Sequence, residues 1–180
     1  ALLEHLPSRR YPISHEGTPQ AGTDNAYQAR VTKQYLMHGS IGPSCAVAWF
    51  KDGTLTVWTH TQGVYPLRAG IAEMVRLPPE RVRCIHAEGS GCYGHNGADD
   101  AAADAALIAM RMPGTPVRVQ WMREQENLWE PYSSAMIGQV HANLDAQGRL
   151  QDWNYELWTT PHNERIVNAG RLLPARLLAR

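Results

Sequence analysis

The sequence has few cysteines, no excess of charge of either sign and no long hydrophobic run. Its three cysteines, Cys45, Cys84 and Cys92, do not make a framework of paired disulfides, and none stands in a C-x-x-C motif. Lys plus Arg and Asp plus Glu number 17 each, so no net field attracts nucleic acid or an anionic membrane surface. No apolar segment approaches the roughly 20 residues that span a bilayer, and the opening ALLEHLPSRRYP lacks the pattern of a cleaved signal peptide. We therefore expect neither a nucleic-acid partner nor a membrane span.

The residues that are present suffice for a hydrophobic core, since 43% of the 180 residues are hydrophobic. This supports one domain or a large piece of a longer protein. Residues 1–30 lack apolar periodicity and carry several prolines and glycines, so we expect an extended arm or linker there. The compact region is expected at 31–160. The stretch 161–180 ends in RLLPARLLAR, whose leucines form an apolar face with nothing left to cover it, and this favours the truncated start of a further segment.

Hydrophobic periodicity predicts the secondary structure between these ends. The predicted elements are strands at 45–50 and 55–59, a helix at 66–75, a strand at 81–87, an alanine-rich helix after Gly97, a strand at 117–122, and strands at 136–144 and 149–158. On the alanine-rich helix, Asp100, Asp104 and Arg111 share one face, which predicts a solvated stripe. The order of elements predicts an α+β fold, a mixed sheet with two β-hairpins and two packed helices.

The alanine-rich helix follows a glycine-rich loop, GSGCYGHNG, which begins at Gly89. Gly89, Gly91 and Gly94 spell the G-x-G-x-x-G fingerprint of dinucleotide-binding folds. In those folds the helix begins among the glycines, whereas this loop runs on to Gly97. Two aspartates in the first helical turn would also repel a pyrophosphate. A lone glycine pattern is therefore a weak indication of a dinucleotide site.

Two other interpretations of this loop concern metal ions and anions. Cys92 and His95 are three residues apart, and Asp99 lies four residues further. Two or three of these could approach a metal ion, but a fourth ligand is missing, so we expect no metal bound directly by protein side chains. In the remaining interpretation, the loop exposes several backbone N–H groups between a strand and a helix. Such a nest binds an oxygen that carries negative charge.

Three stretches carry a resemblance to a known family: HGSIGPSCAVAWFKDGTLTVWTHTQGVYPLR, GCYGHNGADDAAADAALIAM and PGTPVRVQWMREQENLWEPYSSAM. They resemble the molybdopterin-binding (large or beta) subunit of the xanthine dehydrogenase and aldehyde oxidase family. Within it they are most similar to the large (beta) subunits of isoquinoline 1-oxidoreductases and of nicotinate-dehydrogenase-like enzymes. The resemblance extends from about Tyr27 to Arg165 and includes several motifs in order. It implies that the chain is an internal fragment, part of a molybdenum-cofactor-binding domain.

The resemblance implies an oxidoreductase, a molybdenum hydroxylase, once the subunit is complete. Such bacterial enzymes use water to hydroxylate an aromatic N-heterocycle of the isoquinoline or nicotinate type, or to oxidise an aldehyde. They hold molybdenum on molybdopterin, usually in the cytosine dinucleotide form. The implied partners are the remainder of the same subunit, a small [2Fe-2S] iron-sulfur subunit or a cytochrome, and the small-molecule substrate. A soluble location in cytoplasm or periplasm fits equally, and a noncatalytic binding or assembly module that retains the fold is the alternative.

The family motifs imply one side chain and one loop at the molybdenum centre. In the family a glutamine after the second strand of this region hydrogen-bonds the oxo ligand of molybdenum, and THTQGVYPLR puts Gln62 at that position. The residues whose backbone N–H groups are implied to face the same centre are Gly91, Cys92, Tyr93 and Gly94. Tyr93 replaces a phenylalanine of the family, and its ring would either border the substrate or pack in the core.

The sequence also departs from the family pattern. Gly42 stands in HGSIGPS where the family has a glutamate, and the residues around Gly97 lack the purine-binding glutamate of xanthine-oxidising members. Near Arg123 the usual arginine–histidine pair gives way to LWEPYSSAM, in which Trp129 and Tyr132 either wall a substrate pocket or pack. The general-base glutamate that the family carries near its carboxyl terminus is absent from this chain. The isolated fragment is therefore expected to bind no molybdenum cofactor and to be inactive.

Overall fold

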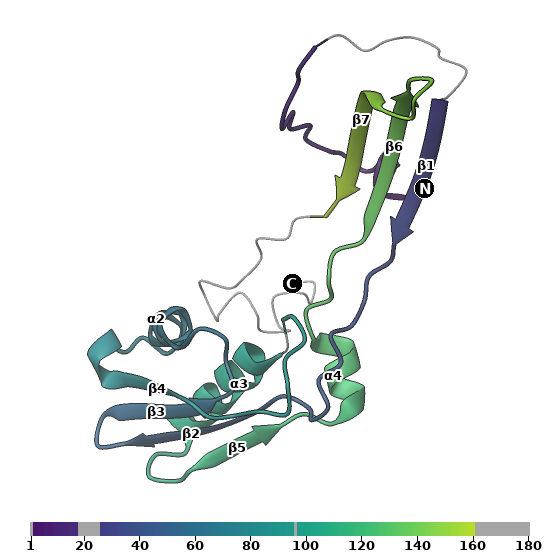
Figure 1. Cartoon of the computed structure of the whole chain (residues 1–180). Helices are drawn as coiled ribbons and strands as arrows, with labels where there is room; N and C mark the ends of the chain where they lie inside the picture. The colour runs from purple at the N-terminus through teal and green to yellow at the C-terminus, as the bar shows by residue number, and fades with distance from the viewer. Residues whose placement is uncertain (1, 18–25, 96, 161–180) are drawn as a thin grey trace. The chain divides into compact units, whose positions relative to one another are not determined.

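The computed structural model describes residues 2–17, 26–95 and 97–160 (Figure 1). Within these residues the chain forms two compact units. Met37–Ser133 make up the four-stranded unit, and the described residues up to Leu36 and from Ser134 onward make up the three-stranded unit. The segment expected at 161–180 lies outside the described residues. Within the three described ranges, no helix is long and apolar enough to span a bilayer.

The four-stranded unit is built on the first predicted hairpin, which is confirmed. β2 (Cys45–Lys51) and β3 (Thr54–Thr59) pair antiparallel. Asp52 and Gly53 connect them with φ angles of 47° and 74°, the two positive values that a two-residue type I′ turn requires. Alternate residues of both strands are buried, as the two-residue period of a strand demands.

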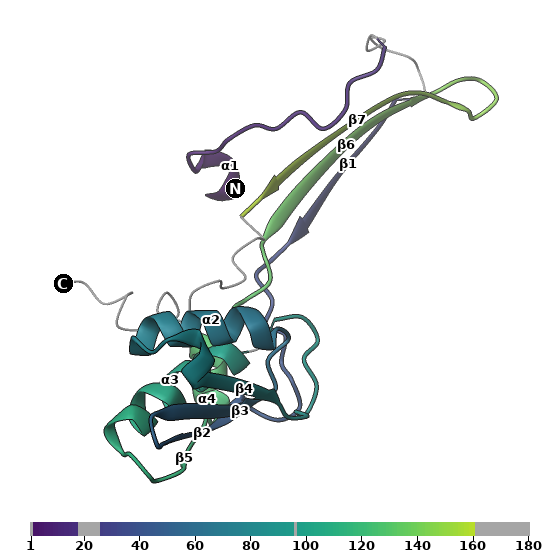
Figure 2. The same ribbon diagram turned by 90° about the vertical axis from the view of Figure 1, so that its left-hand side faces the viewer.

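Two further strands and two helices complete this unit. β4 (Val82–His86) pairs parallel with β3, and β5 (Val117–Gln120) pairs antiparallel with β2, so the order is β4-β3-β2-β5. α2 (Val64–Val75) and the 3-10 turn η1 (Pro79–Arg81) join β3 to β4, and α3 (Ala98–Arg111) joins β4 to β5. α2 and α3 lie on the same side of the mixed sheet (Figures 1 and 2). A short helix, α4 (Arg123–Trp129), follows β5.

α3 lies close to the sheet because it is made largely of alanine. Most of its alanines are buried, and with Leu55, Val57 and Ile71 they form the centre of the core. The predicted solvated stripe on this helix is wrong for Asp100, whose exposed fraction is only 8%. Alanines on nearly every side let the first turn of the helix sink into the unit, so a carboxylate there is carried inside with it.

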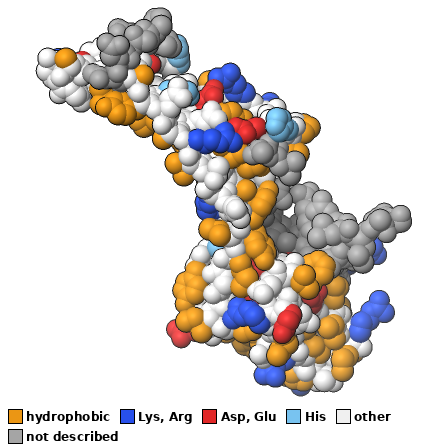
Figure 3. Space-filling model, turned by 90° about the vertical axis from the view of Figure 1, so that its right-hand side faces the viewer, with side chains coloured by type: hydrophobic (Ala, Val, Ile, Leu, Met, Phe, Trp, Pro, Cys, Tyr) orange, Lys and Arg blue, Asp and Glu red, His pale blue; other side chains and the backbone are white. Residues whose placement is uncertain are grey.

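The three-stranded unit contains the second predicted hairpin, which is also confirmed. β6 (Met136–Leu144) and β7 (Leu150–Thr159) pair antiparallel, and Asp145 closes the turn by accepting hydrogen bonds from the N–H groups of Gln147 and Arg149. β1 (Ala26–Lys33) adds a third antiparallel strand beside β6, and α1 (Leu2–His5) precedes it. Figure 3 shows hydrophobic side chains at the surface of this unit among charged ones.

The α+β class, the two hairpins and the two packed helices are thus as predicted. The hairpins belong to two separate sheets, and only the four-stranded sheet is mixed. The sequence patterns predicted neither β1 nor α4. β1 begins at Ala26, inside the stretch expected to be an extended arm. Its partner strand β6 lies about a hundred residues away in the sequence, so no local pattern predicts the pairing.

Candidate functional site

The loops that carry most of the predicted site residues leave the four-stranded sheet at one edge. β3 and β4 are parallel, with Thr59 opposite His86, so both strands end at this edge. β2 begins here, because Ala46 lies opposite Thr59, and β5 ends here, with Gln120 opposite Cys45. The described segments that meet at this loop edge are residues 37–44, 60–63, 87–95 and 121–133. Carboxyl ends of parallel strands are the usual ligand-binding edge of open α/β sheets.

The glycine-rich loop after β4 turns sharply through residues with positive φ. Gly91, Tyr93 and Gly94 have φ angles of 92°, 53° and 138°. Cys92 donates from its Sγ to the carbonyl oxygen of Gly94 at 2.8 Å, which closes the turn on itself. The ring of Tyr93 folds back over Gly91, where a Cβ atom would lie 2.7 Å from the ring Cζ. The loop is therefore held in a backbone conformation that glycine adopts at little cost.

Close packing accounts for three glycines of this loop. A Cβ atom on Gly89 would lie 2.7 Å from the His60 ring, and one on Gly97 would overlap the Trp121 ring. Gly94 is pressed in the same way against the ring of His38. The helix begins at Ala98, beyond the loop, so the glycine spacing of the dinucleotide fingerprint reflects packing in this protein.

The loop presents backbone donors that the described part of the chain does not use. No hydrogen bond from the N–H groups of Gly91, Cys92, Tyr93 or Gly94 is formed to any described residue. The Tyr93 side chain is 61% exposed, so this side of the loop faces solvent. Consecutive free N–H groups in a turn with left-handed residues form a nest that fits the oxygens of an anionic cofactor. The donor set thus suits an anionic group better than a cation.

Gln62 lies in the loop between β3 and α2, with its side chain exposed. Its neighbour Thr61 is buried and fixed: its Oγ1 donates to the Asp99 carboxylate and accepts from the Gly63 N–H at 3.1 Å. The ring Nδ1 of His86 lies 3.1 Å from the Thr61 carbonyl oxygen. The backbone before Gln62 is therefore tied to α3 and β4 while the amide stays available at the loop edge.

His60 is a member of this edge that the sequence did not single out. The backbone N–H of Cys45 donates to its Nε2 at 3.3 Å, and Gly89 lies against its ring. Burial lowers the pKa of His60, which favours the neutral ring that such an acceptor needs. One imidazole thus joins the start of β2 to the glycine-rich loop.

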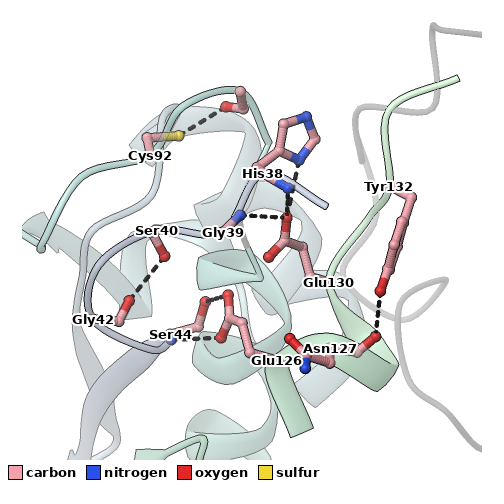
Figure 4. Close-up of polar contacts among 11 residues, drawn as sticks. His38, Gly39, Ser40, Gly42, Ser44, Cys92, Glu126, Asn127, Glu130 and Tyr132 are labelled. Atoms are coloured by element: carbon pink, nitrogen blue, oxygen red, sulfur yellow. Dashed lines mark hydrogen bonds and ion pairs between the residues drawn. The ribbon is translucent and has the colours of Figure 1, made fainter. Parts of the chain in front are cut away.

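α4 holds the segment 38–44 through the side chains of Arg123 and Glu126, and Figure 4 shows the contacts of Glu126. Arg123 donates from Nη2 to the carbonyl oxygens of Ser40 and Ile41 at 2.9 and 2.7 Å. Glu126 is fully buried and accepts from Ser44, from the N–H at 2.7 Å and from the hydroxyl at 3.0 Å. These two contacts tie both the backbone and the side chain of Ser44 to one carboxyl group of α4.

Glu130, just after α4, holds the start of the same segment. Its Oε1 accepts from the backbone N–H of His38 and from that of Gly39 at 3.3 Å, and His38 Nδ1 lies 3.2 Å from this oxygen. The Ile41 N–H in turn donates to the Ser90 carbonyl oxygen at 3.1 Å. Glu126 and Glu130 therefore contact the segment 38–44, which in turn contacts the glycine-rich loop.

Trp129 and Tyr132 are the residues of this region that the sequence offered as candidates for a substrate pocket. Their side chains are 40% and 44% exposed, and the Tyr132 hydroxyl donates to the Asn127 carbonyl oxygen at 2.7 Å, so this ring turns back toward α4 (Figure 4). The sequence feature that could have identified Arg123, Glu126 and Glu130 is their i, i+3, i+7 spacing, which is helical.

In the described ranges, no three His, Cys, Asp or Glu side chains are grouped so that they could hold a metal ion, and Asp99 is engaged by Thr61.

Asp100, next to Asp99, is the most perturbed carboxyl group near the loop edge. Burial, together with the charges of Asp99, Asp104 and Glu126, raises its pKa to about 8. Its Oδ2 has no hydrogen-bond partner among the described residues. The group is therefore protonated at neutral pH in the folded chain.

Comparison with known proteins gives one family match and several relatives. The sequence matches the family described as the molybdopterin cofactor-binding domain over residues 4–161. It is 39% identical over 154 residues to a nicotinate dehydrogenase subunit of Pseudomonas putida, which covers 83% of this chain and 13% of that protein. It is 25% identical over 122 residues to the aldehyde oxidoreductase molybdenum-binding subunit PaoC of Escherichia coli, covering 68% and 17%. The chain spans less than a fifth of either relative.

Two solved structures share the fold. The aldehyde oxidoreductase of Desulfovibrio gigas superposes with a TM-score of 0.65 at 20% identity, covering 76% of this chain and 15% of that chain. Quinoline 2-oxidoreductase from Pseudomonas putida 86 superposes with a TM-score of 0.66 at 17% identity, covering 76% and 18%. At these identities the likeness concerns the fold alone.

Proposed function

The chain belongs to the molybdopterin cofactor-binding domain family, and from this premise we propose that the complete subunit is a molybdenum hydroxylase. Its proposed substrate is an aromatic N-heterocycle of the nicotinate type, which takes up a hydroxyl group derived from water. The similarity to the nicotinate dehydrogenase subunit over most of this chain supports this substrate class. Aldehyde oxidation is the second candidate, supported by the lower identity to the Escherichia coli aldehyde oxidoreductase subunit.

The observation that carries the proposal is the row of N–H groups at Gly91–Gly94, on the exposed side of the loop edge, that no described residue accepts from. These donors would hold anionic oxygens of the cofactor, and the Gln62 amide would donate to a further oxygen of the same group. When bound, the molybdenum cofactor supplies two-electron redox chemistry that no side chain can provide. The exposed ring of Tyr93 would border the substrate.

The finer features of the cofactor and partners belong to the same proposal. We expect the cytosine dinucleotide form of molybdopterin and electron transfer to a small [2Fe-2S] subunit or a cytochrome. Several relatives are named as subunits of larger enzymes, which supports a multi-subunit assembly. Purification of the complete subunit with its partners, followed by elemental and pterin nucleotide analysis, tests this part. A full-length protein without molybdenum and pterin would favour a noncatalytic assembly module instead.

The role of Gln62 is tested by the Gln62→Ala variant of the complete enzyme. We expect turnover with nicotinate-type heterocycles to fall by roughly one to two orders of magnitude, because one donor to developing charge is lost. Molybdenum content should stay nearly unchanged, since the N–H groups of the glycine-rich loop remain. The matched control is Gln147→Ala in the exposed β6–β7 turn, which should leave turnover intact. Wild-type turnover in Gln62→Ala would remove this residue from the site.

A further inference from the structure

The three-stranded sheet has one apolar face, formed by side chains that the register aligns across the strands. Tyr27 lies across β6 from Trp153, and Val31 lies across β6 from Leu157. Tyr155 of β7 belongs to the same face, beside Val140 of β6. The members of this apolar face and their exposed fractions are Tyr27 58%, Val31 66%, Trp153 57%, Tyr155 52% and Leu157 47%.

The opposite face of the same sheet is polar and already has a covering layer. Arg30 on this face receives the Glu4 carboxylate in a two-point ion pair, at 2.6 and 2.8 Å. Glu156 pairs with Arg10 at 3.2 Å, and the Gln139 amide reaches Glu4 at 3.5 Å. The segment before β1 therefore lies on the charged face, while nothing in the described part of this unit covers the apolar face.

This arrangement leaves the unit without a core of its own. Among its described residues, Ala135 and Ile137 are the only buried hydrophobic side chains. A sheet of three strands becomes stable when a second layer covers its hydrophobic face. Five large hydrophobic side chains in adjoining positions exceed the scattered apolar residues that soluble surfaces usually carry.

We propose that the apolar face is packed, in the complete subunit, by a segment of the same polypeptide that lies outside these 180 residues. Between Tyr27 and Val31 on β1, and between Trp153 and Leu157 on β7, the residues that point to this face are all uncharged. A lack of charged side chains is typical of permanent rather than transient interfaces. The relatives leave ample chain for this, because the matched stretch is 13% of the nicotinate dehydrogenase subunit and 15% of the Desulfovibrio gigas chain. The covering segment must be apolar on the side that meets Trp153 and Leu157. This inference goes beyond the proposed function and holds for any substrate.

The test replaces Trp153 by the photo-reactive residue p-benzoylphenylalanine in the complete subunit. Irradiation followed by peptide mass spectrometry should give cross-links to peptides of the same polypeptide beyond residues 1–180. The matched control carries the same residue at Asn154, the next position of β7 on the polar face. There we expect cross-links to residues 2–17 or none. Mixing isotopically light and heavy subunits identifies any link to a second copy.

Each other result would overturn the proposal. Links from position 153 to a different subunit, to a second copy or to residues 37–133 would name another occupant, and an absence of links would show an open face.

A second measurement guards against poor incorporation of the probe. In the complete subunit, Trp153→Lys should lower the melting temperature by about 5 °C or more, because a charge would be buried, whereas Asn154→Lys should change it little. Equal small shifts in the two variants would also overturn the proposal.

Discussion

Asp100 shows how a single residue can be carried into a core by its neighbours. It stands in the first turn of α3, where a carboxylate suits the positive end of the helix, yet the surrounding alanines leave it 8% exposed. Burial is the main cause of its raised pKa, and the nearby carboxylates of Asp99, Asp104 and Glu126 add to it. The folded chain therefore binds a proton that the unfolded chain releases.

The raised pKa predicts a pH-dependent stability. The folded pKa of about 8 lies above the ordinary value of 3.8, so this group stabilises the fold most at low pH, and the contribution is lost as pH rises toward 8. Asp100→Asn removes the ionising group. The variant should become more stable than wild type as pH rises from 5 to 8, by up to roughly 1.4 kcal/mol per pH unit, with a constant difference above 8. Melting temperatures across this range check it.

The matched control for this prediction is Asp52→Asn in the exposed β2–β3 turn, which should give parallel curves for variant and wild type. A difference between Asp100→Asn and wild type that did not vary with pH would mean that Asp100 is ionised in the folded protein. The raised pKa would then be wrong.

At the scale of residues, the sequence predicted those that belong to a family motif. It missed buried residues that accept hydrogen bonds from a segment distant in the sequence. Gln62 and the stretch Gly91–Gly94 were predicted from the family pattern, and the structure puts them at one edge of the sheet, while their roles stay predictions. Glu126 and Glu130 were not predicted. A glutamate is usually solvated, and only the fold reveals that the backbone of another segment faces these two carboxylates.

Among the elements, α4 joins two stretches that are distant in the sequence. Seven residues of helix hold the segment 38–44 by side-chain contacts to its backbone, and that segment meets the glycine-rich loop through Ile41 and Ser90. A further contact of the helix is to the Ser44 hydroxyl, and a Cβ atom on Gly42 would lie 2.5 Å from the Ser90 Oγ, so the held segment is itself constrained at these two positions.

We predict that Glu126→Ala loosens this connection. The change leaves the buried N–H and hydroxyl of Ser44 without their acceptor, which costs about 2–4 kcal/mol. In the complete subunit the melting temperature should fall, and hydrogen exchange should rise in peptides that cover 38–44 and 89–94. The control is Glu124→Ala, an exposed residue of the same helix, which should change neither. Glu126→Gln should be intermediate, since its amide oxygen still accepts from Ser44.

A rise in exchange throughout the chain, rather than in these two stretches, would contradict the connection and indicate a general loss of stability. Unchanged exchange at 89–94 with faster exchange at 38–44 would confine the effect to the first segment.

The elements that sequence predicted well are those whose information is local. The β2–β3 turn, the alanine pattern of α3 and the β6–β7 hairpin each lie within a short window. β1 was missed although Tyr27, Ala29 and Val31 alternate with polar residues, because its partner is distant and prolines and glycines surround it. α4 is too short for hydrophobic periodicity to identify.

At the scale of the whole molecule, the 180-residue chain matches only a small part of its relatives. The resemblance implies a second binding region and a general-base glutamate outside this chain, and the chain covers 13% of its nicotinate dehydrogenase relative. The division expected at residues 30 and 160 stays a prediction. We propose that the loop edge supplies one side of the cofactor site and the remainder of the subunit supplies the other.

This predicts that the 180-residue chain, purified from cells that make the cofactor, contains less than about a tenth of stoichiometric molybdenum and reduces no dye with heterocycles or aldehydes. The contacts from the second binding region would be lost, while the entropic cost of association would remain almost whole. Elemental analysis checks it, and the complete enzyme serves as the control. Near-stoichiometric molybdenum in the short chain would show that the loop edge is sufficient.

The pairing of β1 with β6 sets an order of events during synthesis. Lys33 lies opposite Met136, and the whole four-stranded unit is encoded between them. At about 5–20 residues per second, β1 leaves the ribosome roughly 5–20 s before its partner strand exists. The four-stranded unit, which has its own core, can fold in that interval and bring the two ends of its chain together. During this interval β1 has no partner strand, so its unpaired backbone groups can pair with another chain.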